Sequence, residues 1–131
     1  MIKILHVEDD PVYRAVLKSA LLKQFVGLEV YDAEDEGSAM DVISANAPNL
    51  IIMDIDLKKD TNGLELTRKI KHIYPEIEVI ILSQYDIPEY RHVAQQNGAS
   101  HFFPKSTSLV SIFDYVASVV KKEQDLYACH P

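Results

Sequence analysis

The feature that most constrains the fold is a fivefold alternation of short apolar runs with segments of helical period. The run at 49–53 is too continuously apolar to have one wet face, as is typical of parallel strands covered on both sides. Strands that alternate with helices predict an α/β fold, a doubly wound parallel sheet of five strands and five helices with right-handed crossovers. The expected strands span residues 2–7, 28–32, 49–53, 78–82 and 100–103, and the expected helices span 11–25, 35–45, 64–72, 88–97 and a last helix from 109.

Helix boundaries and inward faces follow from local signals. Asp10 before Pro11 predicts an N-cap followed by a first-turn proline, and Gly98 predicts a helix stop. Apolar spacing predicts these inward residues: Tyr13, Val16, Leu17, Ala20 and Leu21; Ala39, Val42 and Ile43; Leu66, Ile70 and Ile73; Leu109, Ile112, Phe113, Val116 and Val120.

Length and charge limit the function classes. The 131 residues suit one domain, and a formal charge of −7 would repel nucleic acid and anionic membranes. A single cysteine, Cys129, cannot form an internal disulfide, and no apolar run is long enough to span a bilayer, which favours a cytoplasmic protein. We expect a domain at 1–122 and a loosely held C-terminal tail at 123–131.

Polar side chains follow four of the five predicted strands directly. In doubly wound sheets, ligands bind beyond the carboxyl ends of the strands, where the strand order reverses. Taken singly, each residue has an ordinary role: Asp10 caps a helix, a serine fits a turn, and a lysine fits the surface. Taken together, they predict one polar site, formed by Glu8, Asp9, Asp54, Asp56, Ser83 and Lys105.

The gathered carboxylates predict a cation at this edge. A like-charged pair about 4 Å apart costs about 4 kcal/mol at an effective dielectric near 20, so a positive charge should relieve them. Mg²⁺ prefers one or two carboxylates together with waters and phosphate oxygens, and Lys105 can offset a further charge. The set therefore predicts phosphoryl chemistry, in which one carboxylate can serve as a nucleophile and form an aspartyl phosphate.

The ordered motifs resemble the receiver domain of two-component response regulators. The resemblance runs from about residue 2 to 122 and is closest to receivers that usually precede a helix-turn-helix DNA-binding domain. It implies the flavodoxin-like (βα)5 fold with strand order 2-1-3-4-5. The motifs are VEDD at 7–10, IIMD at 51–54, NGLEL at 62–66, ILS at 81–83, NGAS at 97–100 and FFPK at 102–105.

The resemblance also assigns roles to site residues. Asp54 would accept a phosphoryl group from a sensor histidine kinase or a phosphotransfer protein. Asp9 and Asp54 would hold Mg²⁺ directly, Glu8 through water, and Asp56 through its backbone carbonyl. The remaining assignments are Ser83 as the switch hydroxyl, Lys105 as the phosphoryl-pairing lysine and Phe102 as the switch aromatic residue.

Three positions depart from the family pattern. The loop at 55–61 is about one residue longer than usual, and Ser106 replaces the proline that commonly follows the lysine. Gln84 stands where a small residue is preferred. We expect Gln84, with Tyr85 beside it, to slow the attack of water on phosphorylated Asp54.

Rival interpretations come from other classes. The DID sequence at 54–56 also opens haloacid-dehalogenase-like phosphohydrolases, although the late acidic pair of that family has no counterpart here. A degenerate receiver that binds proteins without being phosphorylated is a further alternative. Lys58 and Lys59 stand where an EF-hand needs an acid or amide and a glycine, and the acids after the first strand would repel a flavin phosphate.

The output is the least constrained part of the prediction. A surface formed by the fourth helix, the fifth strand and the last helix would change on phosphorylation, which adds roughly 1.5 to 2 negative charges. Receivers commonly dimerise or meet targets there, and the resemblance to this subfamily implies a downstream output in transcription. We expect either an excised receiver or a stand-alone one, with no direct contact to nucleic acid or membrane.

Overall fold

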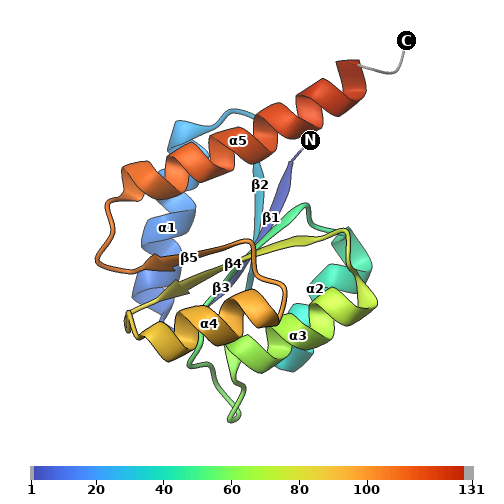
Figure 1. Ribbon diagram of the computed structural model, residues 1–131. Helices are drawn as coiled ribbons and strands as arrows, with labels where there is room; N and C mark the ends of the chain where they lie inside the picture. Colours follow the sequence, from blue (N-terminus) through green and yellow to red (C-terminus); the bar gives the residue numbers. More distant parts are fainter. Residues whose placement is uncertain (1, 129–131) are drawn as a thin grey trace.

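The computed structural model describes the backbone of residues 2–128 and the side chains of residues 2–125. Its elements alternate as predicted, in a parallel sheet of order β2-β1-β3-β4-β5 (Figure 1). Both the doubly wound fold class and the strand order are confirmed. The elements are β1 (Lys3–Val7), α1 (Pro11–Gln24), β2 (Glu29–Ala33), α2 (Glu36–Asn46), β3 (Leu50–Met53), α3 (Gly63–Ile73), β4 (Glu78–Ser83), α4 (Pro88–Gln96), β5 (His101–Pro104) and α5 (Leu109–Ala128).

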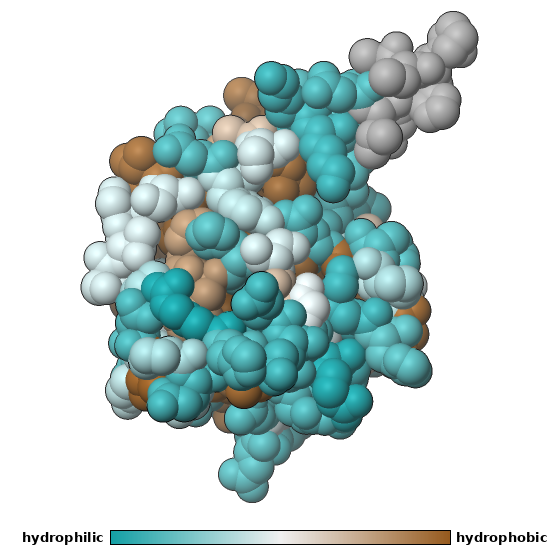
Figure 2. Space-filling view, in the orientation of Figure 1, coloured by the Kyte–Doolittle hydropathy of each residue, from teal (hydrophilic) through white to brown (hydrophobic). Residues whose placement is uncertain are grey.

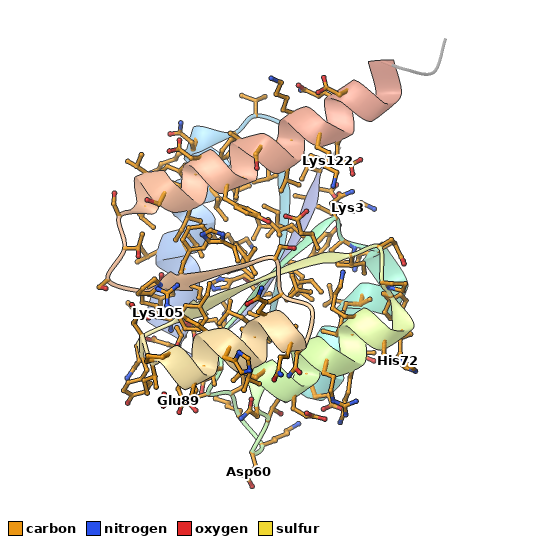
Figure 3. The ribbon with its side chains drawn as sticks, viewed as in Figure 1. Lys3, Asp60, His72, Glu89, Lys105 and Lys122 are labelled. Carbon is orange, nitrogen blue, oxygen red and sulfur yellow. The ribbon has the colours of Figure 1, made fainter. Side chains whose placement is uncertain are left out.

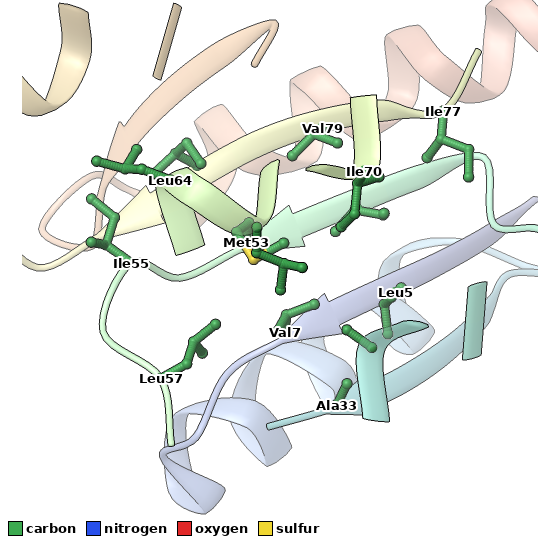
Figure 4. Packing of buried hydrophobic residues seen from close by; sticks show 14 of the residues in the cluster. Leu5, Val7, Ala33, Met53, Ile55, Leu57, Leu64, Ile70, Ile77 and Val79 are labelled. Carbon is green, nitrogen blue, oxygen red and sulfur yellow. The ribbon is translucent and has the colours of Figure 1, made fainter. Parts of the chain in front are cut away.

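Two hydrophobic layers enclose the sheet. Helices α2, α3 and α4 cover one face, where Ile43, Leu66 and Ile70 pack against alternate residues of the strands. Figure 4 labels Ile70 together with Val7, Met53 and Val79 of the strands. Helices α1 and α5 cover the other face through Leu17, Leu21 and three residues of α5: Ile112, Val116 and Val119. All four residues of the central strand β3 are fully buried between these layers, which explains the continuously apolar sequence of this strand.

Some predicted inward positions are wrong. Val16 and Ile73 are both 55% exposed, and Leu109 at the start of α5 is 36% exposed. In α1 the stripe that reaches the sheet is narrow, formed by Leu17 and Leu21 four residues apart, and Val16 lies on a neighbouring face of the helix. Conversely, Val119 is buried although it was not predicted.

The helix ends obey their local signals. The Asp10 side chain accepts from the Val12 N–H at 2.9 Å, so the N-cap prediction is confirmed. Gly98 follows the last turn of α4 with a φ of 99°, a conformation that an L-residue adopts only with strain.

Helix α5 continues through the segment expected to form a loose tail, as far as Ala128 (Figure 1). Cys129 lies outside the described residues. None of the described helices is long and apolar enough to cross a membrane. Polar residues cover most of the face visible in Figure 2, and hydrophobic residues occur there in separate small areas.

Candidate functional site

The acids at the centre of the site are held by backbone hydrogen bonds that continue the sheet past its strands. The Glu8 N–H donates to the Ala33 carbonyl at 2.9 Å, and the Asp54 N–H donates to the Val7 carbonyl at 3.0 Å. The Lys105 N–H donates in the same way to the last residue of β4, at 2.6 Å. These side chains therefore lie at one edge of the sheet. At this edge the chain leaves β1 and β3 toward opposite faces of the sheet, and the strand order reverses.

Three carboxylates meet at this edge. One oxygen from each of Glu8, Asp9 and Asp54 lies within 4.8 Å of the others. Opposite ligands of an octahedral Mg²⁺ lie about 4.2 Å apart, so the spacing and the all-oxygen donor set both fit this ion. Asp56 is exposed, and its carboxylate does not belong to the cluster. Its predicted role was through the backbone carbonyl and stays a prediction.

Lys105 brings the positive charge predicted for the site. Its ammonium donates to Glu8 Oε1 and lies 3.5 Å from Asp54 Oδ2. Burial alone would lower the pKa of Lys105, but the two acids outweigh it and raise that pKa, so the side chain stays charged. Lys105 follows β5 at the carboxyl edge of the sheet, whereas Lys3 begins β1 at the opposite edge, and Figure 3 labels both. One ammonium against three carboxylates leaves the cluster short of positive charge.

Because positive charge is short, the pKa of Asp54 is raised. Its burial, together with the hydrogen bond and the charge of Glu8, raises the pKa of Asp54 to about 8. Burial opposes the ionisation of Glu8 too, but hydrogen bonds from Asp54 and Lys105 outweigh it and lower the pKa of Glu8. Without a metal ion, Glu8 is therefore ionised at neutral pH and Asp54 holds a proton that a cation would displace.

Gly63 supports the backbone of Asp54 from the start of α3. A Cβ at this position would lie 1.7 Å from the Asp54 carbonyl oxygen, so no other residue type fits without displacing the chain. The Gly63 N–H also donates to the Ile55 carbonyl at 2.6 Å. Sequence reasoning included Gly63 in a motif but missed this role, for which the NG pair at a helix start was the available signal.

A comparison of sequences decides the family. The sequence model of the response regulator receiver domain matches residues 4–117, most of the chain. The chain belongs to this family. The predicted receiver resemblance is thus confirmed, and the haloacid-dehalogenase, EF-hand and flavin alternatives are replaced by it.

Curated relatives of this receiver domain are regulators about twice its length. The transcriptional regulatory protein DegU of Brevibacillus brevis is 29% identical over 120 residues, which is 92% of this chain and 50% of that protein. The oxygen regulatory protein NreC of Staphylococcus haemolyticus is 31% identical over 121 residues, 92% of this chain and 56% of that protein. The chain thus spans about half the length of these relatives.

Solved structures show the same fold. A CheY-like receiver domain protein from Methanospirillum hungatei superposes with a TM-score of 0.84 at 25% identity, covering 95% of this chain and 98% of that one. A DNA-binding response regulator of the LuxR family from Staphylococcus aureus gives 0.82 at 23% identity, covering 91% and 98%. At this identity the second likeness concerns the fold alone.

The two residues predicted to be switch positions, Ser83 and Phe102, are both buried. Ser83 ends β4, and its hydroxyl accepts from the Tyr85 N–H at 3.1 Å. Phe102 lies on β5 with its ring covered by Arg91, whose Cζ is 4.8 Å from the ring centroid. Gln84 and Tyr85 are exposed just beyond Ser83, and their predicted effect on water stays a prediction.

Charged side chains at the rim tie the long loop after Asp54 to the loop before α2. Lys58 Nζ lies 3.3 Å from Glu34 Oε2, and Lys59 Nζ lies 3.1 Å from Asp35 Oδ2. Arg14 of α1 donates to the Glu8 carbonyl at 2.9 Å. The spacing of residues in the sequence did not predict these contacts, because they join segments that only the fold brings together.

The histidines that the structure describes lie outside the acidic cluster. His6 is buried on β1, where burial lowers its pKa to about 4, so the ring is neutral at pH 7. The acidic cluster is the only group of three potential metal ligands among the described residues, and it contains no histidine.

Proposed function

We propose that this receiver domain is a phosphorylation switch in which Asp54 accepts the phosphoryl group. The observation that carries the proposal is the meeting of three carboxylates and the Lys105 ammonium around Asp54. Family membership supports the assignment, since receiver domains are signalling domains of response regulators.

The transfer is a displacement at phosphorus. An oxygen of the ionised Asp54 carboxylate attacks the phosphorus atom, a new P–O bond forms, and the P–N bond of a donor phosphohistidine breaks. The leaving imidazole nitrogen keeps the electron pair and takes a proton. Lys105 and Ser83 bind the phosphoryl oxygens, which places an ammonium and a hydroxyl beside the charge that develops.

The acids would hold Mg²⁺ for this step. Asp9 and Asp54 would bind it directly, Glu8 would act mainly through a water, and Asp56 would offer its backbone carbonyl. A bound Mg²⁺ neutralises phosphoryl oxygens during transfer. Asp54 would give up its proton when the cation binds, and the carboxylate oxygen that does not hold the cation would be the nucleophile.

Membership of the receiver family supports the proposed donor and output. A sensor histidine kinase or a phosphotransfer protein supplies the phosphoryl group, and its charge on Asp54 pulls Ser83 and Lys105 toward it. Phe102 then changes between two states, and the α4-β5-α5 face changes with it, which serves homodimer formation or a downstream partner. Because the relative DegU is named a transcriptional regulator, we assign transcription control to the output.

Gln84 and Tyr85 would modulate the lifetime of the phosphorylated state. Both side chains are exposed directly beyond Ser83, the last residue of β4. Replacing Gln84 by alanine should raise the dephosphorylation rate, measured by loss of the adduct after the donor is removed. An unchanged rate would contradict this part of the proposal.

The test is incubation of the protein with Mg²⁺ and acetyl phosphate, followed by intact-mass measurement. Native protein should gain one phosphoryl group that is labile to alkali, with release of acetate. Asp54→Asn should gain none, and Asp60→Asn, an acid at the exposed tip of the loop (Figure 3), should behave like native protein. No adduct on native protein would instead support a degenerate receiver.

A further inference from the structure

A tyrosine ring forms the uncharged side of the site around the Lys105 ammonium. Lys105 Nζ lies over the face of Tyr13, 4.5 Å from the ring centroid. A cation within about 6 Å of a ring centroid is attracted to the negative face of the ring. The other partners of this ammonium are the carboxyl groups of Glu8 and Asp54, so three side chains surround it.

The Tyr13 ring is fixed by its own neighbours. Tyr13 lies in the first turn of α1, where its N–H donates to Asp10 Oδ1 at 3.4 Å. Its ring meets the buried His6 ring edge to face, with centroids 6.1 Å apart and planes at 61°. Burial raises the pKa of Tyr13, so the phenol is neutral at pH 7. The contact with Lys105 is thus between a cation and a neutral ring.

The three partners of Lys105 differ in what a divalent cation does to them. Glu8 accepts from Lys105 and also belongs to the acidic cluster, so a bound cation competes with Lys105 for that carboxylate. Asp54 belongs to the same cluster. The Tyr13 ring offers no oxygen ligand from its face, and a cation at the acids leaves the ring contact in place.

We propose that Tyr13 is a positioning residue that keeps the Lys105 ammonium beside Asp54 while the carboxylates engage the metal ion. The inference rests on the proposed phosphoacceptor function and adds a residue to it. A leucine at this position would fill the space without attracting the ammonium. A phenylalanine would keep the ring face, so it should rescue what leucine loses.

The first measurement needs neither metal nor phosphodonor. Trace acylation with acetic anhydride, read by mass spectrometry, reports how readily the Lys105 ammonium loses its proton, with Lys69 of α3 as internal reference. Tyr13→Leu should raise the relative reactivity of Lys105 about three- to tenfold, the range of a partly desolvated cation–π contact. Tyr13→Phe should bring it back toward the native value.

The second measurement follows phosphorylation by acetyl phosphate with saturating Mg²⁺. Tyr13→Leu should slow the reaction about three- to tenfold, and Tyr13→Phe should recover most of the rate. Tyr74→Leu, which removes a tyrosine at the end of α3, serves as the matched control and should change neither readout. Should Tyr13→Leu fail to fold by circular dichroism, Tyr13→Met replaces it.

The outcomes separate the two proposals. Equal Lys105 reactivity in native and leucine proteins, or a phenylalanine variant as reactive as the leucine variant, would overturn the positioning role. The positioning role would also be overturned if the reactivity of Lys105 depends on the Tyr13 ring while Tyr13→Leu is phosphorylated at the native rate. Absence of any adduct on native protein overturns the phosphoacceptor function, whatever the acylation result.

Discussion

Two aspartates of this receiver domain have nearly the same exposure and opposite acidities. Asp35 is 5% exposed and Asp54 is 8% exposed. Asp35 opens α2 as its N-cap and accepts from the Ser38 N–H at 2.8 Å and from the Ser38 hydroxyl at 2.9 Å. These two hydrogen bonds, with a further contact from Lys59, lower the pKa of Asp35 to about 2.

Asp54 has fewer donors and an acidic neighbour. It accepts from the Ile55 N–H at 2.8 Å, and its other oxygen lies 3.5 Å from the Lys105 ammonium, which Glu8 also engages. Burial and Glu8 raise the pKa of Asp54 to about 8. The comparison teaches that the balance of donors against competing carboxylates decides acidity here, and that it leaves Asp54 in need of a cation.

The largest expected effect is steric and falls only on the Asp54 side. Gly63→Ala places a methyl group against the Asp54 carbonyl and should lower the free energy of unfolding by about 3 kcal/mol. The matched control is Gly37→Ala beside Asp35, where a Cβ meets only Asp35 Oδ1 at 3.6 Å. That variant should be neutral or gain up to about 1 kcal/mol. Urea unfolding measures both, and equal effects would contradict the close approach.

The next effect is the pH dependence of stability from Asp54. Its folded pKa of about 8 exceeds the ordinary 3.8, so between these values the folded state holds a proton that the unfolded chain has released. This contribution is complete below the unfolded pKa and is lost as pH rises through 8. In EDTA, the stability of Asp54→Asn relative to native protein should therefore rise by about 2 kcal/mol from pH 5 to pH 8. A difference that does not change with pH, in urea titrations, would contradict the raised pKa.

A smaller effect with the opposite pH dependence belongs to Asp35. Asp35→Ala should lower the Tm by about 4 °C at pH 7, because it removes the cap of α2. Since the folded pKa is depressed to about 2, the stabilisation is present above the unfolded pKa and is lost as pH falls through 2. Asp35→Asn should retain most of the Tm, because an amide oxygen can still accept. Calorimetry at pH 7 and pH 3 measures the Tm difference between Asp35→Ala and native protein, which should be smaller at pH 3. An equal Tm difference at both pH values would contradict the depressed pKa of Asp35.

The smallest effect concerns the lysine that pairs with Asp35. Lys59 has a side chain 81% exposed, so solvent screens its charge. Lys59→Met should change the Tm by only about 1 °C. A loss as large as that of Asp35→Ala, in the same calorimetry, would show that the ion pair and not the Ser38 donors stabilises the cap.

Much of the fold was predictable because β3 and β4 are nearly continuous apolar runs and because short strand-like runs alternate with helical segments five times. The strand ends were predictable for the same reason. Because ligands of doubly wound sheets bind beyond the carboxyl ends of the strands, the sequence alone also placed Glu8, Asp9, Asp54 and Lys105 in one site. Val16 and Ile73 were wrongly predicted to face inward, since apolar spacing does not say how wide the contact of a helix with its sheet is.

The details that govern chemistry were not predictable. The contact between the Tyr13 ring and Lys105 joins the first turn of α1 to the end of β5. The spacing of these two residues in the sequence does not predict this contact. The opposite acidities of Asp35 and Asp54 depend on which donors reach each oxygen, and residue type is the same in both. Such contacts arise only once the chain is folded.

The most direct test of the central claim is to locate the phosphoryl group. After incubation with Mg²⁺ and acetyl phosphate, borohydride reduces an aspartyl phosphate to homoserine, which tandem mass spectrometry assigns to one residue. The account predicts homoserine at position 54, dependent on Mg²⁺ and absent from Asp54→Asn. Homoserine at another acid, or none at all, would contradict it.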